Sequence, residues 1–348
     1  MDCPVLRPLL PLALLFSTGC VRKTIDNFTT QRVVPTAMLT ADVDRVCKVG
    51  EALGHPLNSV THRSPHRAMV IADATAAICD EVRAWEAQTD GVVARTVASP
   101  GSARIAAVKD RLAVERRFRQ RAALRFRSAW EHSNQQFGPI GLDSTCPRVR
   151  SKDELTLLVG LVSGTLAMIH DKASGGRNHV PLDTLARVGR AAPCLDDATW
   201  WHVPSALQAA AWIVVPGSGP EGVDPWEQLH TAAVAGESSG VRLGWALYAE
   251  LAANSGEDAR VHEAIEAASR SYEHTESNAD YAMLDEYSRS ILLHESDRIW
   301  AAERGHRTPV FGQLPAEPLP IEPSEDDPFA EDPFGDDPSE EESPEDPQ

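Results

Sequence analysis

The chain has 348 residues, of which 42% are hydrophobic and 6% aromatic, and its 51 acidic residues outnumber 33 basic ones to give a formal charge of −18. Fourteen of the acidic residues and no Lys or Arg lie in residues 309–348, so the chain before this tail is nearly neutral. No apolar run approaches the roughly 20 residues that a spanning helix needs, which excludes proteins with several membrane spans; collagen-like chains, disulfide-dense miniproteins and strongly basic nucleic-acid binders are excluded by composition and charge.

The first residues have the pattern of an export signal. Arg7 precedes a short apolar run over residues 9–16, and small residues follow before Cys20. The tetrapeptide STGC that ends at Cys20 resembles a bacterial lipobox, which implies that residues 1–19 are removed, that Cys20 is lipidated, and that acyl chains anchor the protein. Val21 after the cysteine favours the periplasmic face of the outer membrane. An ordinary secretory signal with an incidental cysteine is the alternative.

Helix signals follow one another through the first half of the chain. Apolar residues recur at spacings of three and four over residues 43–53, and the Ser-Pro pairs at 64–65 and 99–100 each place an N-cap before a proline at the first helical position. The second pair starts a long helix towards Phe137. Residues 151–154 (SKDE) have the capping-box pattern and precede an apolar helix that two glycines, Gly175 and Gly176, terminate.

The second half behaves likewise. Pro181 is expected to open a short helix with Leu182 on its apolar face, and residues 198–215 are apolar nearly all round, which predicts a central helix with a kink or start near Pro204. Asp224 and Pro225 start another helix. Three more are expected over residues 241–253, 258–272 and 279–303.

Four cysteines remain once Cys3 is removed and Cys20 is lipidated. They are Cys47, Cys79, Cys146 and Cys194. An even number in an oxidising compartment allows two disulfides. Because Cys47 and Cys79 lie on the apolar faces of successive predicted helices, Cys47–Cys79 with Cys146–Cys194 is the first pairing to expect. Buried free thiols are the alternative.

These elements predict an all-α fold, an α-solenoid of stacked helical hairpins similar to tetratricopeptide proteins, over residues 40–307. An irregular helical bundle is the alternative. Residues 20–39 are expected to be a tether after the lipidated cysteine. Residues 308–348 are expected to be disordered, because ten prolines and 14 acidic residues leave little apolar surface to bury.

Two tempting motifs lack the context they need. Residues 217–222 (GSGPEG) match G-x-G-x-x-G, but the preceding run looks helical and no βαβ unit surrounds it, so a turn is expected. His262-Glu263 and His294-Glu295 begin like a zinc motif, but the second histidine is absent. The sequence therefore predicts no enzyme, no cofactor and no metal.

The long helix predicted to run towards Phe137 contains a stretch rich in arginine. Its candidate docking residues are Arg116, Arg117, Arg119, Arg121, Arg125 and Arg127. They would bind anionic lipid, an acidic partner or the chain's own tail, and nucleic acid is not expected in the periplasm. The alternative is a solvated face whose arginine stems cover apolar surface.

The order of these pieces resembles the T-component lipoproteins of tripartite ATP-independent periplasmic (TRAP) transporters. The resemblance rests on the lipobox, the Arg-rich helix at residues 116–130, the sequence VRLGWALYAE at residues 241–250, and a last helix ending in ESDRIWAAE. It implies a tetratricopeptide-like helical protein able to form a homotrimer, with an apolar channel, that partners a periplasmic solute-binding protein.

The resemblance makes a set of aromatic residues the candidates for a ligand pocket or channel: Trp200, Trp201, Trp212, Trp226, Trp245 and Tyr248. For each of them, plain core packing is the alternative. The expected function is that of a non-enzymatic lipoprotein assisting TRAP-type solute transport. A helical adaptor for envelope assembly, without ligand transport, is the other reading.

Overall fold

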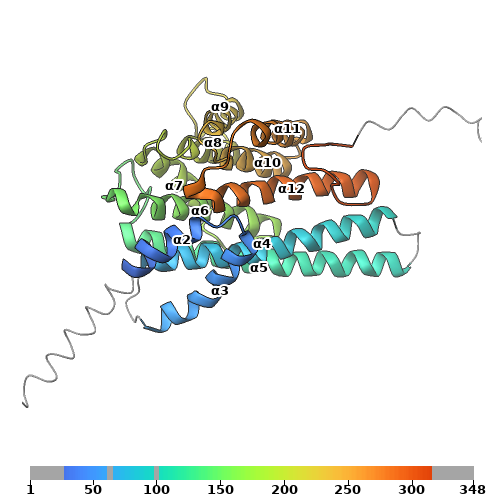
Figure 1. The fold of residues 1–348 in the computed structure, drawn as a ribbon, viewed down its shortest axis with the longest axis horizontal. Coiled ribbons are helices and arrows are strands. Elements are labelled where there is room, and N and C mark those ends of the chain that lie inside the picture. The colour runs from blue at the N-terminus through green and yellow to red at the C-terminus, as the bar shows by residue number, and fades with distance from the viewer. Residues whose placement is uncertain (1–26, 61–65, 98–101, 316–348) are drawn as a thin grey trace, which may run out of the picture. The chain divides into compact units, whose positions relative to one another are not determined.

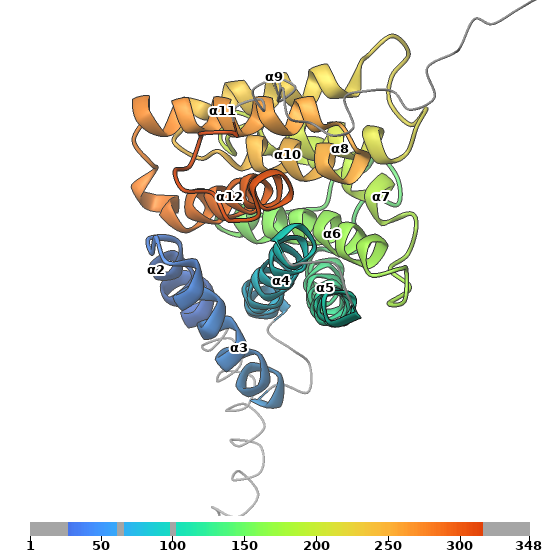
Figure 2. The same ribbon diagram turned by 90° about the vertical axis from the view of Figure 1, so that its right-hand side faces the viewer.

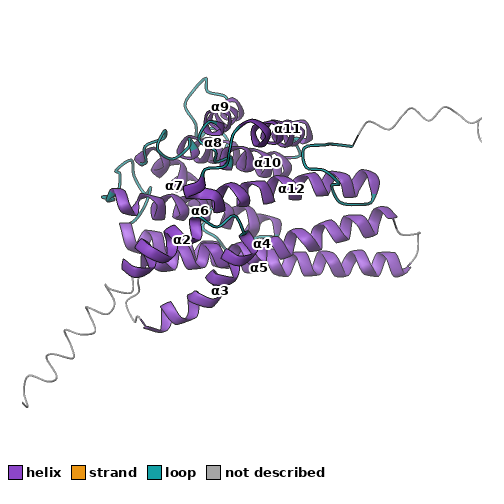
Figure 3. Ribbon diagram, viewed as in Figure 1, coloured by secondary structure: helices purple, strands orange, loops and turns teal. Residues whose placement is uncertain are grey.

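A computed structural model describes residues 27–60, 66–97 and 102–315 of the chain. Within these ranges the protein is all-α, with eleven α-helices, short 3₁₀ and π-helical turns and no strand (Figures 1 and 3). The predicted fold class is confirmed. The signal residues 1–19, Cys20 and residues 316–348 of the predicted tail lie outside the described residues.

The predicted tether is partly wrong, because part of it is helical and packs into the core. A π-helical turn (Thr29–Val33) leads into α2 (Val34–Met38), and α3 (Val43–Val60) follows. Val34 and Met38 are 5% and 2% exposed and belong to the main hydrophobic core. Burial of these two apolar side chains offsets part of the entropy cost of ordering the segment.

The longest helices form an antiparallel pair. They are α4 (His66–Val97) and α5 (Ser102–Phe137), and α6 (Glu154–Ala173) packs against both of them. Figure 2 looks along the pair, with α6 and α12 above it and α8–α11 beyond. The expected capping box of Ser151 and Glu154 does not form, because residues 151–153 make a 3₁₀ turn and α6 begins only at Glu154. The Glu154 carboxylate instead accepts the Trp200 indole N–H at 3.0 Å.

Six helices complete the described part of the chain. They are α7 (Thr184–Ala191), α8 (Val203–Val214), α9 (Pro225–Glu237), α10 (Leu243–Ser255), α11 (Asp258–His274) and α12 (Ala282–Arg304). Pro204 lies in the first turn of α8, and Asp224 caps α9 by accepting the Trp226 backbone N–H at 2.8 Å. Leu182 is 86% exposed and precedes α7, so its predicted place on an apolar helix face is wrong.

Consecutive helices pack as neighbours, but the last helix returns to the first half of the molecule. α12 packs against α10 and also against α4, α2 and α3 (Figure 1). In an open solenoid each repeat contacts only its neighbours. This return of α12 to the first half of the molecule is typical of an irregular helical bundle, which is the alternative that the sequence left open. The solenoid arrangement stays a prediction.

Two disulfides join the four cysteines in the pairing predicted from the sequence. Cys47–Cys79 links α3 to α4, and Cys146–Cys194 links the loop after α5 to the turn after α7. The first is tightly enclosed, and Gly50 shows how close its helices approach: a Cβ there would lie 2.6 Å from the backbone nitrogen of Ala76. Only glycine fits at such a crossing.

The folded body extends past the predicted start of the tail. The Thr308 backbone N–H donates to Asp297 at 2.9 Å, and the Trp300 indole donates to the carbonyl of Gln313 at 2.8 Å. The Phe311 ring lies 6.0 Å from that of Tyr272. Residues 308–315 therefore pack against α11 and α12, with Phe311 supplying apolar surface.

One segment of the described chain, Ser151–Ala173, is long and apolar enough to cross a membrane by length and composition. This corrects the expectation that no apolar run approaches that length. Of its apolar window, 72% is buried against the other helices. Such burial is typical of a central core helix in a water-soluble helical body.

Candidate functional site

The six aromatic residues proposed to line a pocket do not come together. Trp200 and Trp201 pack edge-to-face on each other and on Tyr281, whereas Trp226, Trp245 and Tyr248 form a second cluster around His230. Trp212 lies against Gly219 in the loop after α8.

The two buried indole donors that were candidates are already used inside the protein. Trp200 donates to Glu154 at 3.0 Å and Trp245 to Glu237 at 2.7 Å. Edge-to-face packing with satisfied donors is the arrangement expected of core aromatics. Trp245 also borders a separate open groove of about 350 Å³ with His230 and Glu237. A ligand channel formed by the six residues stays a prediction.

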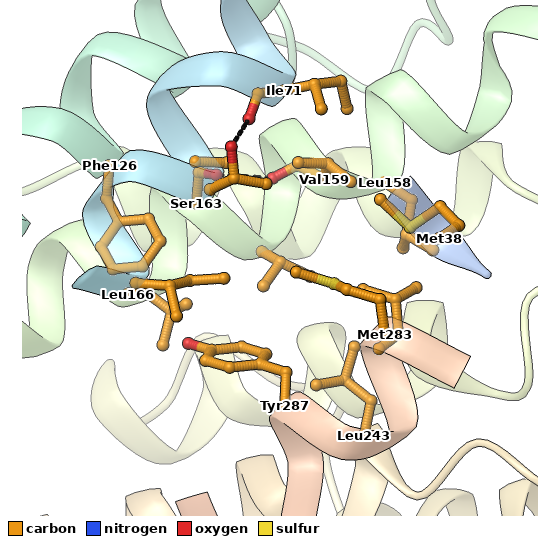
Figure 4. Close-up of a pocket in the computed structure, with 15 residues that line it drawn as sticks. Met38, Ile71, Phe126, Leu158, Val159, Ser163, Leu166, Leu243, Met283 and Tyr287 are labelled. Atoms are coloured by element: carbon orange, nitrogen blue, oxygen red, sulfur yellow. Dashed lines mark hydrogen bonds between the residues drawn. The ribbon is translucent and has the colours of Figure 1, made fainter. Parts of the chain in front are cut away.

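An apolar cavity lies instead at the centre of the body, where α2, α4, α5, α6, α10 and α12 meet (Figure 4). Its volume is about 50 Å³. The lining comprises Met38, Ile71, Ala74, Thr75, Ile78, Phe126, Leu158, Val159, Val162, Ser163, Leu166, Leu243, Met283, Leu284 and Tyr287. Met38 of the short helix α2 and Met283 of α12 lie on one side of it (Figure 4). Methionine side chains are flexible, so this wall can repack.

The serine and threonine hydroxyl groups that border the cavity are bonded within their own helices. Ser163 donates to the carbonyl of Val159 at 2.7 Å, and Thr75 donates to that of Ile71 at 2.7 Å (Figure 4). Neither has a base beside it to activate it as a nucleophile. The lining of the cavity is suited to an apolar group.

A buried polar network lies beside the cavity, next to the rings of Phe126 and Tyr287. The Tyr287 hydroxyl donates to Glu81 Oε2 at 2.5 Å, and His170 Nε2 lies 2.7 Å from Glu81 Oε1. Arg119 Nη1 lies 3.4 Å from His170 Nδ1. Because arginine can only donate, Nδ1 accepts, and Nε2 carries the proton given to Glu81. Phe126 stacks on His170 with 5.7 Å between ring centroids, separating the network from the cavity.

A second group of buried charged residues, around Glu295, lies further along α12. Glu295 accepts from Arg298 Nε at 2.9 Å, and His294 stacks on Trp85 at 5.0 Å. Burial raises the pKa of Glu295 to about 7, against the opposing charge of Arg298 and with help from the Glu250 carboxylate. Burial, with Arg119 and Arg298 nearby, lowers the pKa of His294 well below its ordinary value.

We expect the stability of the protein to depend on Glu295 between pH 5 and pH 8. A carboxyl group whose pKa is higher in the folded than in the unfolded state favours folding at low pH and loses that contribution as the pH rises through the folded pKa. The loss amounts to about 3 kcal/mol for a shift from 4.5 to about 7. Urea unfolding at each pH should show wild type losing this much relative to Glu295→Gln.

His294 acts in the opposite direction, because a histidine held neutral loses stabilisation as the pH falls below its unfolded pKa. It is present in both wild type and Glu295→Gln, so the difference between the two curves isolates Glu295. Parallel curves from pH 5 to pH 8 would contradict the assignment.

Four of the six arginines predicted to form a basic docking face bond to other residues of the protein. Arg119 is 6% exposed and bonds Glu115 and Gln88, and Arg121 pairs with Asp80 at 2.8 Å. Arg125 pairs with Glu51 and Asp80, both at 2.9 Å, and Arg127 with Glu131 at 2.7 Å. Six arginines within 12 residues point all round a helix of 3.6 residues per turn, so they cannot form one free surface.

Arg116 and Arg117 differ from the other four. Both are exposed, and neither has a hydrogen-bond or ion-pair partner within residues 27–60, 66–97 and 102–315. Arg121 is also about half exposed although it pairs with Asp80, so a docking face that includes these three arginines stays a prediction.

Comparison of the chain with models of known families, with curated proteins and with solved structures found no match in any of the three. In the part of the chain that the structure describes, no group of three or more His, Cys, Asp or Glu is arranged to hold a metal ion. The apolar cavity and the polar network behind it are therefore the features from which a function must be argued.

Proposed function

We propose that this protein is a non-enzymatic, lipid-anchored helical protein of the bacterial envelope that binds a small apolar ligand in the cavity beneath α2. The observation that carries the proposal is the cavity itself, enclosed by six helices and lined by apolar side chains whose few hydroxyl groups are already bonded. A pocket without a reactive group favours binding over turnover.

The closed cavity is too small for most ligands. Its volume of about 50 Å³ compares with the roughly 150 Å³ that accommodates benzene in an engineered protein cavity. Entry of a larger molecule requires α2 to move and the side chains of Met38 and Met283 to repack. α2 has only five residues, and the chain continues from its N-terminal side towards the predicted anchor at Cys20.

The proposal also places the protein in an oxidising cellular compartment. Two disulfides fit an oxidising environment such as the periplasm, and the lipobox pattern supports attachment through Cys20 to the periplasmic face of the outer membrane. In the finer form of the proposal the protein is an accessory of a TRAP-type transport system that partners a periplasmic solute-binding protein, with a homotrimer as one assembly. A scaffold for envelope assembly is the alternative at that level.

Filling the cavity should abolish ligand binding. We expect N-phenyl-1-naphthylamine, an apolar fluorescent probe, to give a saturable signal with wild type and one weakened about tenfold or more by Ala74→Leu, because the larger side chain occupies the space that the ligand would fill. Ala74 is 6% exposed and lines the cavity. The measurement is a fluorescence titration of the full-length protein.

Ala87→Leu is the matched control, because Ala87 is also a buried alanine of α4 but lies outside the cavity lining. Circular dichroism should show both variants folded. An absence of saturable binding to wild type, or equal losses in the two variants, would count against the proposal.

A further inference from the structure

Another open hollow lies on the outside of the body, along the first helices of the described chain. It is a groove of about 510 Å³ between the π-helical turn, α2 and the first half of α3. Figure 2 shows α3 at the lower edge of the body and α9 at the upper edge. α2 borders both this α2–α3 groove and the central cavity, which Met38 lines. The lining of the groove comprises Phe28, Arg32, Val33, Thr36, Ala37, Thr40, Arg45, Val46 and Val49.

Apolar side chains are exposed along this groove. Phe28 is 61% and Val49 is 40% exposed, and Val33 is half-buried in the same lining. Single apolar residues are common on protein surfaces, but several that border one hollow are typical of a contact surface. Phe28 in particular would gain free energy by leaving water for an apolar environment.

The charged groups of the lining are both basic. Arg32 and Arg45 are exposed, and neither has an ion-pair partner in the described part of the chain, where the lining contains no Asp or Glu. The acidic residues at the start of α3, Asp42 and Asp44, border a different hollow, and Asp44 pairs with Lys48 at 2.9 Å. Apolar side chains flanked by unpaired arginines suit an anionic bilayer surface, because guanidinium groups donate to phosphates while apolar groups enter the headgroup boundary.

The place of the groove along the chain is an observation independent of its chemistry. The predicted lipid anchor, Cys20, stands seven positions before Asn27, the first described residue, so the chain allows at most about 25 Å between them. Two of the residues between them, Arg22 and Lys23, are also basic. A surface tethered this closely to a bilayer meets it at a high effective concentration, so a weak contact is enough to populate the docked orientation.

We propose that the α2–α3 groove is a membrane-contact face, which lies on the anionic phospholipid bilayer that holds the acyl chains of Cys20. The inference rests on the lipid anchor of the proposed function and adds a fixed orientation of the body, which a tether alone does not give. Phe28 and Val49 enter the boundary between headgroups and acyl chains, while Arg32 and Arg45 donate to lipid phosphates. The contact also holds α2, and with it one wall of the central cavity, next to the bilayer.

Nitroxide labels on the lipidated protein distinguish a docked body from one that is free on its tether. The protein is placed in vesicles of phosphatidylcholine mixed with phosphatidylglycerol and labelled at Thr36→Cys, in the groove, or at the matched Thr231→Cys, which is exposed on α9. Disulfides and lipidation occupy the other cysteines of the processed chain. We expect the label at position 36 to be shielded from a water-soluble nickel complex and reached by oxygen, and the label at position 231 to stay accessible to nickel.

Removal of the two arginines tests the role of charge. The double variant Arg32→Gln, Arg45→Gln should shift the balance between docked and undocked orientations by roughly thirtyfold, the effect of two basic residues at an anionic surface, and expose the label at position 36. Arg148→Gln, Arg177→Gln is the matched control, since both residues are exposed and lie outside the groove.

Three results would overturn the inference. They are equal nickel access at positions 36 and 231, unchanged shielding in the variant of the groove, and an equal effect of the control pair. Mass spectrometry of Cys20 separates the two proposals: an unacylated cysteine counts against both the anchor and the contact face, whereas acylated protein with an accessible label at position 36 counts against the contact face alone.

Discussion

Replacement of Arg242 by methionine is expected to lower the free energy of unfolding by about 3–5 kcal/mol, because it leaves a buried carboxylate without its partner. Arg242 is 0% exposed at the start of α10 and donates to Asp285 Oδ2 at 2.7 Å. It also donates to Ser271 and to the carbonyl of Thr275, and its guanidinium lies 4.1 Å from the Tyr272 ring centroid. One side chain thus ties α10 to α11 and α12.

The double variant Arg242→Met, Asp285→Leu shows whether the loss comes from the abandoned charge. Removing both partners of a buried pair is commonly far less costly than removing one, so the double variant should recover most of the stability. Urea unfolding followed by circular dichroism measures both. A double variant as unstable as Arg242→Met alone would mean that packing against Tyr272, rather than the charge pair, is the larger contribution.

The helices could be predicted from the sequence because capping residues and the spacing of apolar residues indicate where a helix begins and which of its faces is buried. Asp224 caps α9 where the Asp-Pro pair predicted it, and Gly175 and Gly176 end α6 with φ of 92° and 69°. These features depend on residues a few positions apart. Residues 151–154 show the limit of such reasoning, because the Glu154 carboxylate, which the capping box would use, bonds instead to the indole of the distant Trp200.

The candidate site could not be predicted in the same way, because its residues come from six helices. Glu81 and Tyr287 are 206 positions apart, and the sequence contains no spacing that joins them. The resemblance directed attention to five tryptophans, which the structure places in separate clusters and of which Trp200, Trp201 and Trp245 are buried. A usable indication did exist in α4, which buries residues on nearly every side, so a charged residue such as Glu81 within it needs an internal partner.

A mild reductant added to the folded protein should reduce the Cys146–Cys194 disulfide before the Cys47–Cys79 disulfide. Cys146 is exposed, whereas Cys47 and Cys79 are 2% and 3% exposed, so a thiolate can attack the Cys146–Cys194 bond without prior unfolding. Alkylation of freed thiols followed by mass spectrometry should show Cys146 and Cys194 labelled first. Early labelling of Cys47 would contradict this order.

Loss of the Cys146–Cys194 bond by the double change to alanine should then lower the free energy of unfolding by roughly 4 kcal/mol, the chain-entropy value for cysteines 48 residues apart. The bond holds the loop after α5 against the turn that leads to α8, so the loss should loosen α7 and α8 before it affects α4. Hydrogen exchange measured by helix can test this. Uniform loss of protection throughout α4–α8 would instead mean that the domain unfolds as one cooperative unit.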